Sequence, residues 1–222
     1  MQKHILTGIV GLVVGLIGGF AGANALNRNY VSQPAQASPQ QAVAPQQTTG
    51  GSQPLPDVAN MLLKAESEPQ NFAVQMRTGD MYARIGRFEQ AIEFYKKGIS
   101  LRPQDFNANV VLANAYFDSG AFDNAAEYYS KALALNPSDV NARTDLGATY
   151  VERAAPDYDR AIKEFTTTLE SDPTHAPSLY YLAVAQFRKG DVAEAQKTLS
   201  RLERTNPNSD LVERLRQNIA SK

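Results

Sequence analysis

The chain has 222 residues, of which 43% are hydrophobic and 20% are charged, and this composition suits one globular domain with additional sequence. Its formal net charge is -1, and it has no cluster of Lys and Arg of the kind that neutralises phosphates, so we expect no nucleic-acid partner. Cysteine is absent, which excludes disulfides, thiolate catalysis and cysteine-based metal sites.

An uncharged apolar run of 19 residues lies near the N-terminus, at residues 5–23, between Lys3 and Arg28. As a helix it would be about 28 Å long, close to the ~30 Å hydrocarbon core of a bilayer. The balance of basic residues favours an N-terminus that stays inside and a remainder that is translocated. We therefore expect residues 1–27 to be a single-pass transmembrane anchor in a bacterial cytoplasmic (inner) membrane, with the rest of the chain periplasmic.

The same segment also fits a cleavable signal peptide, whose cleavage site would be marked by the small residues Ala23 and Ala25. We favour the anchor because the apolar run is longer than most signal-peptide cores. Within it, Gly11, Gly15 and Gly19 recur at every fourth position, a spacing that would let two membrane helices approach closely and form a homodimer. Glycine is also simply frequent in such helices.

Residues 28–56 are predicted to be a disordered linker. From residue 31 onward this stretch carries no charge and is rich in Gln, Pro and Ala. Such a composition cannot bury enough apolar surface to offset the entropy that is lost on ordering. The next segment, residues 57–71, contains apolar residues at helical spacing and is expected to be a helix that caps the following domain.

Five prolines then recur at a nearly constant interval, separated by 34, 34, 36 and 34 residues: Pro69, Pro103, Pro137, Pro173 and Pro207. A period near 34 residues is the signature of an array of helix-turn-helix units. Aligned on the prolines, four units cover residues 72–209, with the boundaries 72–105, 106–139, 140–175 and 176–209.

Small residues recur where the two helices of each unit would cross: Gly79, Ala113, Gly147 and Ala183 in the first helix, and Ala91, Ala125, Ala161 and Ala195 in the second. Large residues such as Tyr82 and Tyr95 follow them. This alternation lets two helix backbones approach while the large side chains fill the space beside them. The third unit has two extra residues in its turn, and the fourth has Gln186 and Leu202 at positions that are aromatic and small in the first unit.

On these residues the chain resembles the tetratricopeptide repeat family, as in Gly79-Asp80-Met81-Tyr82 followed by Ala91-Ile92-Glu93-Phe94-Tyr95 and Pro103. The resemblance implies an all-α fold: a superhelix of antiparallel helix hairpins, with four repeats and capping helices at residues 57–71 and 210–222. It also implies that a peptide or partner protein binds in a concave groove lined by the first helix of each unit.

Helical spacing predicts which side chains line this groove: Met76, Asp80, Arg84, Val110, Asn114, Phe117, Thr144, Val151, Tyr180, Val184 and Phe187. Several are large and apolar, and an exposed apolar strip is typical of a binding site, with Phe117 and Tyr180 as the foremost candidates. The alternative is that they pack against neighbouring units. Family members that hold the C-terminal carboxylate of chaperones do so with Lys and Asn, and only Asn114 fits that pattern, so such tails are not expected to bind.

No enzyme, metal site or cofactor is expected. The chain has two histidines, His4 and His175, and no phosphate-binding loop or serine nucleophile motif. In layout, an anchor followed by such repeats is similar to subunits of bacterial cytochrome c biogenesis machinery that hold the apocytochrome, and to ancillary subunits of the secretion translocon with chaperone-like roles. The resulting hypothesis is a membrane-anchored scaffold that serves the assembly or maturation of an extracytoplasmic complex.

Overall fold

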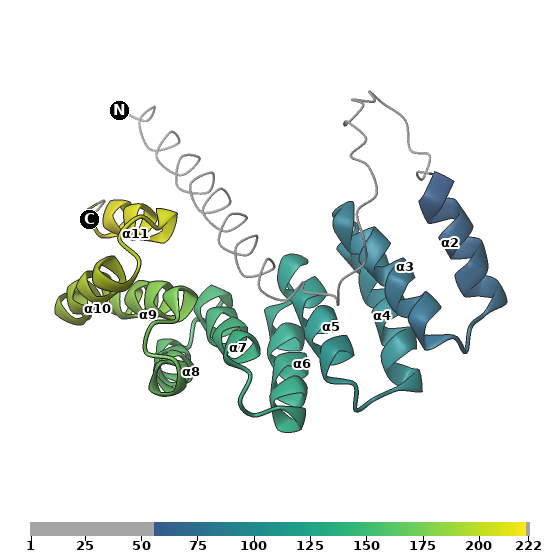
Figure 1. Cartoon of the computed structure of the whole chain (residues 1–222), viewed down its shortest axis with the longest axis horizontal. Helices are drawn as coiled ribbons and strands as arrows, with labels where there is room; N and C mark the ends of the chain where they lie inside the picture. Colours follow the sequence, from purple (N-terminus) through teal and green to yellow (C-terminus); the bar gives the residue numbers. More distant parts are fainter. Residues whose placement is uncertain (1–55, 221–222) are drawn as a thin grey trace, which may run out of the picture. The chain divides into compact units, whose positions relative to one another are not determined.

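The computed structural model describes residues 56–220, and within this range the chain forms ten helices and no strands (Figure 1). The helices are α2 (Pro56–Ser67), α3 (Phe72–Arg84), α4 (Phe88–Leu101), α5 (Phe106–Asp118), α6 (Phe122–Leu135), α7 (Val140–Glu152), α8 (Tyr158–Ser171), α9 (Ala176–Lys189), α10 (Val192–Thr205) and α11 (Asp210–Ala220). The prediction of an all-α repeat fold is confirmed.

The predicted anchor, with Gly11, Gly15 and Gly19, lies outside the described residues, as does most of the predicted linker. Between residues 56 and 220, no helix combines the length and the apolar character that crossing a bilayer requires.

Consecutive helices pack as antiparallel hairpins (Figure 1). The hairpins are α3 with α4, α5 with α6, α7 with α8, and α9 with α10, and we call their members the first and second helices. Each second helix also packs on the first helix of the following hairpin. Outside the hairpins, α2 packs on α3, and α11 packs on α9 and α10.

Each first helix begins after a residue whose side chain caps it: Asn71, Asp105, Asp139 and His175. In each case a side-chain oxygen or ring nitrogen accepts a hydrogen bond from the backbone N–H three residues later, over 2.8 to 3.4 Å. Such a cap satisfies one of the backbone donors that the first turn of a helix leaves unpaired, and it is worth about 1 kcal/mol. The caps therefore fix where every hairpin starts.

Three of the four hairpin turns contain a glycine with a positive φ angle: 72° at Gly86, 80° at Gly120 and 105° at Gly190. Glycine adopts this left-handed conformation without the steric penalty of a Cβ atom. The third hairpin has the two extra residues in place of the glycine, yet its Asp157 N–H still donates to the Tyr150 carbonyl at 2.9 Å. In the first hairpin, Arg87 makes the same bond to Tyr82 at 3.0 Å, so the insertion leaves the closing hydrogen bond intact.

The helices of a hairpin approach most closely at the small residues. A Cβ atom added at Gly79 would lie 2.5 Å from the Tyr95 ring, and one added at Gly147 would lie 2.5 Å from the Phe165 ring. Both rings are buried. The absence of a side chain at these two positions therefore creates the space that the aromatic rings of the second helices fill.

In the first three hairpins, polar residues at one repeated position tie the first helix to the helix end or turn before it, and the sequence did not predict these contacts. Gln75 Nε2 donates to the Ala65 carbonyl at 3.0 Å and to the Glu68 carbonyl at 3.3 Å. At the equivalent positions, Asn109 Nδ2 donates to the Pro103 carbonyl at 3.1 Å, and Arg143 Nη2 donates to the Pro137 carbonyl at 2.8 Å. The Ala65, Pro103 and Pro137 carbonyls lie in or just after the last turn of the preceding helix, where carbonyls lack an intrahelical partner, whereas the Glu68 carbonyl also accepts the Asn71 N–H at 3.0 Å.

The third and fourth hairpins meet at a group of polar side chains around His175. Its Nδ1 lies 2.9 Å from the Ser178 hydroxyl and its Nε2 lies 3.2 Å from Asn141 Oδ1, while Thr144 and Ser178 place their hydroxyls 2.6 Å apart. Nδ1 is also the acceptor that caps α9. Burial lowers the pKa of the His175 imidazole below its usual 6.5, although nearby carboxylates act in the opposite direction. The ring is therefore held in its neutral form.

A larger side chain at the closest helix approach should destabilise the array. We expect Gly147→Val to lower the free energy of unfolding by about 2 kcal/mol, because the added atoms overlap the Phe165 ring and the packed helices must move apart. Ala134→Val on the exposed side of α6 is the matched control and should lower stability by less than about 1 kcal/mol, which is the cost of valine in a helix. Urea unfolding followed by circular dichroism measures both, and equal stability of the two variants would contradict the packing argument.

Acidification should destabilise the array in part through His175. Because the folded-state pKa lies below the unfolded value of 6.5, the unfolded chain binds more protons as the pH falls through and below that value, and stability is lost. His175→Asn keeps an acceptor for the α9 cap but does not titrate. We therefore compare melting temperatures between about pH 7.5 and about pH 5, which lie on either side of the usual pKa of histidine. Over this interval the melting temperature of the unmodified chain should fall more steeply than that of His175→Asn. Parallel pH profiles would show that the histidine contributes nothing.

Candidate protein-interaction surface

Three of the predicted groove residues line one pocket. Met76, Asp80 and Arg84 lie on successive turns of α3 and border a cavity of about 710 Å³ between α2 and α3, which we call the α2–α3 pocket. Its other lining residues are Asn60, Met61, Lys64, Ala73, Arg77 and Met81. Asp80 and Arg84 are exposed and Met76 is half-buried. The structure thus brings an apolar floor and charged side chains together at the N-terminal end of the array.

The other predicted groove residues are much less accessible. The exposed fraction is at most 7% for six of them: Val110, Phe117, Thr144, Val151, Tyr180 and Val184. Asn114 and Phe187 are half-buried. The exposed apolar strip that we expected is therefore not found at these six positions, and their part in partner binding stays a prediction.

Tyr180 is covered by the last helix of the chain itself. Arg214 and Asn218 of α11 lie near its hydroxyl, and Asn218 forms a side-chain hydrogen bond with it. Burial raises the pKa of Tyr180, and the positive charge of Arg214 only partly offsets this effect. The neighbouring Tyr181 is also buried, with its ring stacked 5.9 Å from that of Phe165. Both tyrosines therefore help to attach α11 and α8 to α9.

Two of the predicted groove residues are held by tyrosines of the second helices. The Tyr95 hydroxyl donates to Asp80 Oδ1 at 2.7 Å, and the Tyr129 hydroxyl donates to Asn114 Oδ1 at 2.6 Å. Both bonds span 15 residues, and their regular spacing is the signal by which the sequence could have revealed them. In the third hairpin the equivalent residues are Phe165 and Ala148, so the donor and the acceptor are missing together.

An ion pair joins the first helices of the third and fourth hairpins. Arg188 Nη1 lies 3.0 Å from Glu152 Oε1, with side-chain exposures of 33% and 19%. A partly exposed pair of this kind contributes less than about 1 kcal/mol. A partner could therefore form an ion pair with Arg188 or Glu152 only if this pair were broken.

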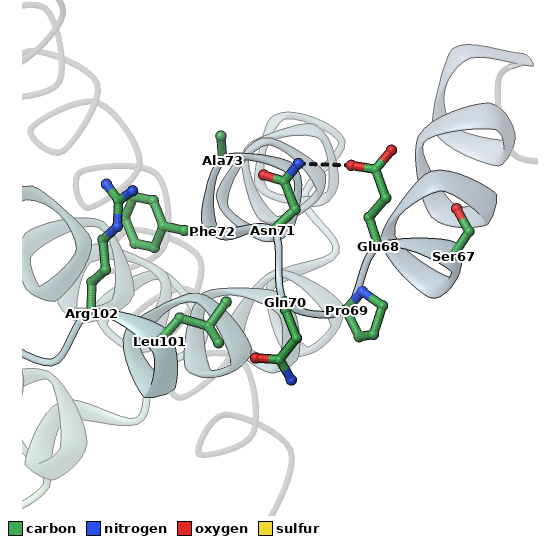
Figure 2. A pocket seen from close by; sticks show the side chains of 9 residues that line it. All are labelled: Ser67, Glu68, Pro69, Gln70, Asn71, Phe72, Ala73, Leu101 and Arg102. Atoms are coloured by element: carbon green, nitrogen blue, oxygen red, sulfur yellow. Dashed lines mark hydrogen bonds between the residues drawn. The ribbon is translucent and has the colours of Figure 1, made fainter.

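A further pocket, of about 750 Å³, lies at the turn between α2 and α3 beside the end of α4 (Figure 2). Two pairs of its side chains contact each other. Asn71 Nδ2 donates to Glu68 Oε2 at 2.7 Å, and the guanidinium of Arg102 lies 4.4 Å from the centroid of the Phe72 ring. Since these contacts hold the turn and the two helix ends together, we assign this pocket a structural role.

Among residues 56–220, no group of three or more His, Cys, Asp or Glu side chains is arranged so that it could hold a metal ion. His175, the histidine of this region, has its two ring nitrogens next to Ser178 and Asn141. Its contacts are those of a helix cap at the junction of two hairpins.

Family models and solved structures both match this fold. A tetratricopeptide repeat model matches residues 153–219, and a TPR repeat model matches residues 79–117 and 113–153. A crystal structure of MamA is 24% identical with a TM-score of 0.62, and the match covers 68% of this chain and 86% of that chain. MamA from Desulfovibrio magneticus RS-1, from residue 41 to its end, is 19% identical with a TM-score of 0.63, covering 69% of this chain and 85% of that chain.

No curated protein sequence matches the chain. The likeness to MamA, at these identities, shows a shared fold. Together with the hairpins described above, the two family models show that residues 79–219 are built of tetratricopeptide repeats.

Proposed function

We propose that this protein is a scaffold that binds a protein or peptide partner on the side of the array formed by the predicted groove residues. The observation that carries the proposal is the α2–α3 pocket, where Met76, Asp80 and Arg84 meet at an accessible cavity within an array of tetratricopeptide repeats. A concave, partly apolar site with a few charged groups suits a partner side chain or helix. The fold alone does not name the partner, because 307 chains of solved structures match it.

The scaffold is further proposed to be tethered to a bacterial cytoplasmic membrane by residues 1–27, with residues 28–56 as a spacer and the repeats on the extracytoplasmic side. The uncharged run at residues 5–23 supports the anchor, and the absence of charge in residues 31–56 supports the spacer. If the first segment is instead a cleaved signal peptide, the repeats are still exported.

In this setting the partner would belong to an extracytoplasmic complex under assembly or maturation. The alternatives are a role in c-type cytochrome biogenesis, in which the array holds the apocytochrome, and a role as a chaperone associated with the translocon. Both rest on similarity of layout. The identity of the captured partner distinguishes them, because an apocytochrome supports the first alternative and a translocon subunit supports the second.

Site-specific photocrosslinking in cells tests the binding side. We expect benzoylphenylalanine at Asn114 or Phe187, which are half-buried groove positions on α5 and α9, to form adducts with a partner. The same residue at Lys96 or Lys163, which are exposed on the second helices α4 and α8, should form few or none. Adducts formed only from the second-helix positions would move the binding site to the other side of the array.

The anchor has its own test. We expect the full chain to stay in the membrane pellet after alkaline carbonate extraction, since a spanning apolar helix is not released by removal of electrostatic contacts. The mature N-terminus should then lie before the apolar run. Release of the chain into the supernatant, together with a mature sequence that starts at Leu26, would instead establish the signal peptide.

A further inference from the structure

The first helix of the first hairpin is covered differently from the first helices of the later hairpins. Ala115 of α5 belongs to the buried cluster formed by α2, α3, α4 and α5, and Val111 packs against that cluster. At the equivalent positions of α9, Tyr181 and Ala185 are buried. In α3 the same two positions hold Arg77, which is exposed, and Met81, which is half-buried.

This difference has a structural cause. In the second hairpin these positions pack on the cluster shared with the first hairpin, and in the fourth hairpin Tyr181 stacks on Phe165 of the third. Before α3, the described residues contain α2, which packs on α3 as a second helix packs on the next first helix, and α2 has no hairpin partner of its own within residues 56–220. The α2–α3 pocket therefore lies where the first helix of that incomplete hairpin would pack.

The floor of the α2–α3 pocket is unusually rich in methionine. The chain contains four methionines, and apart from Met1 all of them line this pocket: Met61, Met76 and Met81. Methionine is unbranched and polarizable, so a surface of thioethers can adapt to the apolar side chains of a partner. Met76 also packs against Gly98 of α4, which anchors the floor to the first hairpin.

The charged residues of the α2–α3 pocket limit which kind of segment can bind there. Lys64, Arg77 and Arg84 line the pocket together with a single carboxylate, Asp80, which already accepts the Tyr95 hydroxyl. Between residues 56 and 220, none of these three cations forms an ion pair. The upstream part of this chain is a poor complement, because residues 1–56 contain no Asp or Glu. A net positive, methionine-lined pocket favours an occupant that is acidic and amphipathic.

We propose that the α2–α3 pocket is the docking site for an acidic, amphipathic helix of a partner protein, which takes the place of the first helix of the incomplete hairpin. The pocket extends along α3 from Ala73 to Arg84, about 17 Å at 1.5 Å per residue, which corresponds to about three turns of partner helix. Apolar side chains on one face of that helix contact the three methionines. Asp and Glu residues beside them pair with Lys64, Arg77 and Arg84.

This inference rests on the proposed scaffold function and names the class of its partner. The probe is a fluorescein-labelled helical peptide of about 16 residues with Leu at heptad spacing and Glu on the flanks, titrated against the full chain in a non-ionic detergent. A peptide with the same Leu pattern and Lys on the flanks is the charge control. Anisotropy is measured for both, and binding to detergent alone is subtracted.

The matched variants are Arg77→Glu, in the pocket, and Lys96→Glu, an exposed position on α4 outside it. Both change the net charge by the same amount, and circular dichroism verifies that both fold. We expect Arg77→Glu to weaken binding of the Leu/Glu peptide roughly tenfold or more, and Lys96→Glu to change it by less than about twofold. The Leu/Lys peptide should bind at least about tenfold more weakly than the Leu/Glu peptide.

Three results would overturn the proposal: no binding of the Leu/Glu peptide, equal binding of both peptides, or equal effects of the two variants. Sedimentation adds a fourth, since self-association that Arg77→Glu abolishes would make a second copy of this chain the occupant. If the Leu/Glu peptide does not bind as expected but Asn114 and Phe187 still crosslink a partner, only this inference is wrong and the proposed scaffold function stands. If the peptide binds as expected but Asn114 and Phe187 form no crosslinks, the docking site stands and the proposed binding side of the array is wrong.

Discussion

The fold depends on one kind of contact, in which a glycine or alanine of the first helix lets the second helix of the hairpin approach closely. Gly79 makes room for Tyr95, and Gly147 makes room for Phe165. Protein interiors are packed to the density of organic crystals, so the size of these residues sets how closely the two backbones approach. The second and fourth hairpins have Ala113 and Ala183 at the same position, so a small residue recurs in all four units and lets them stack in a similar way.

This interior contact also orients surface residues. The ring of Tyr95 fills the space beside Gly79, and its hydroxyl reaches Asp80 on the neighbouring position of the same first helix. The position of a side chain that borders the α2–α3 pocket is therefore fixed by a ring that belongs to the core. A hydrogen bond that orients a charged acceptor in this way gives a binding site a defined geometry before any partner arrives.

The two ends of the described array differ in how they are covered. At the C-terminal end, α11 buries Leu211, Val212 and Leu215 and covers Tyr180. At the N-terminal end, α2 contributes Val58 and Ala65 to the core but leaves an accessible pocket beside α3. The exposed side of α11 is polar, with Glu213, Arg216 and Gln217, as is typical of a capping helix. The methionines that line the α2–α3 pocket do not form such a polar face. The N-terminal end of the described array is therefore the stronger candidate for partner binding.

The sequence by itself determined the repeat, because close helix crossing demands small residues at fixed positions and the 34-residue period makes them visible. Helical spacing also predicted which positions share one side of the first helices, and three of these, Met76, Asp80 and Arg84, line the α2–α3 pocket. It did not predict that Val110, Phe117 and Tyr180 are covered, since side-chain exposure depends on elements distant in sequence, such as α11 over Tyr180. The carbonyl bonds of Gln75, Asn109 and Arg143 were likewise decided by the tertiary structure, because only the packed turns bring those donors and acceptors together.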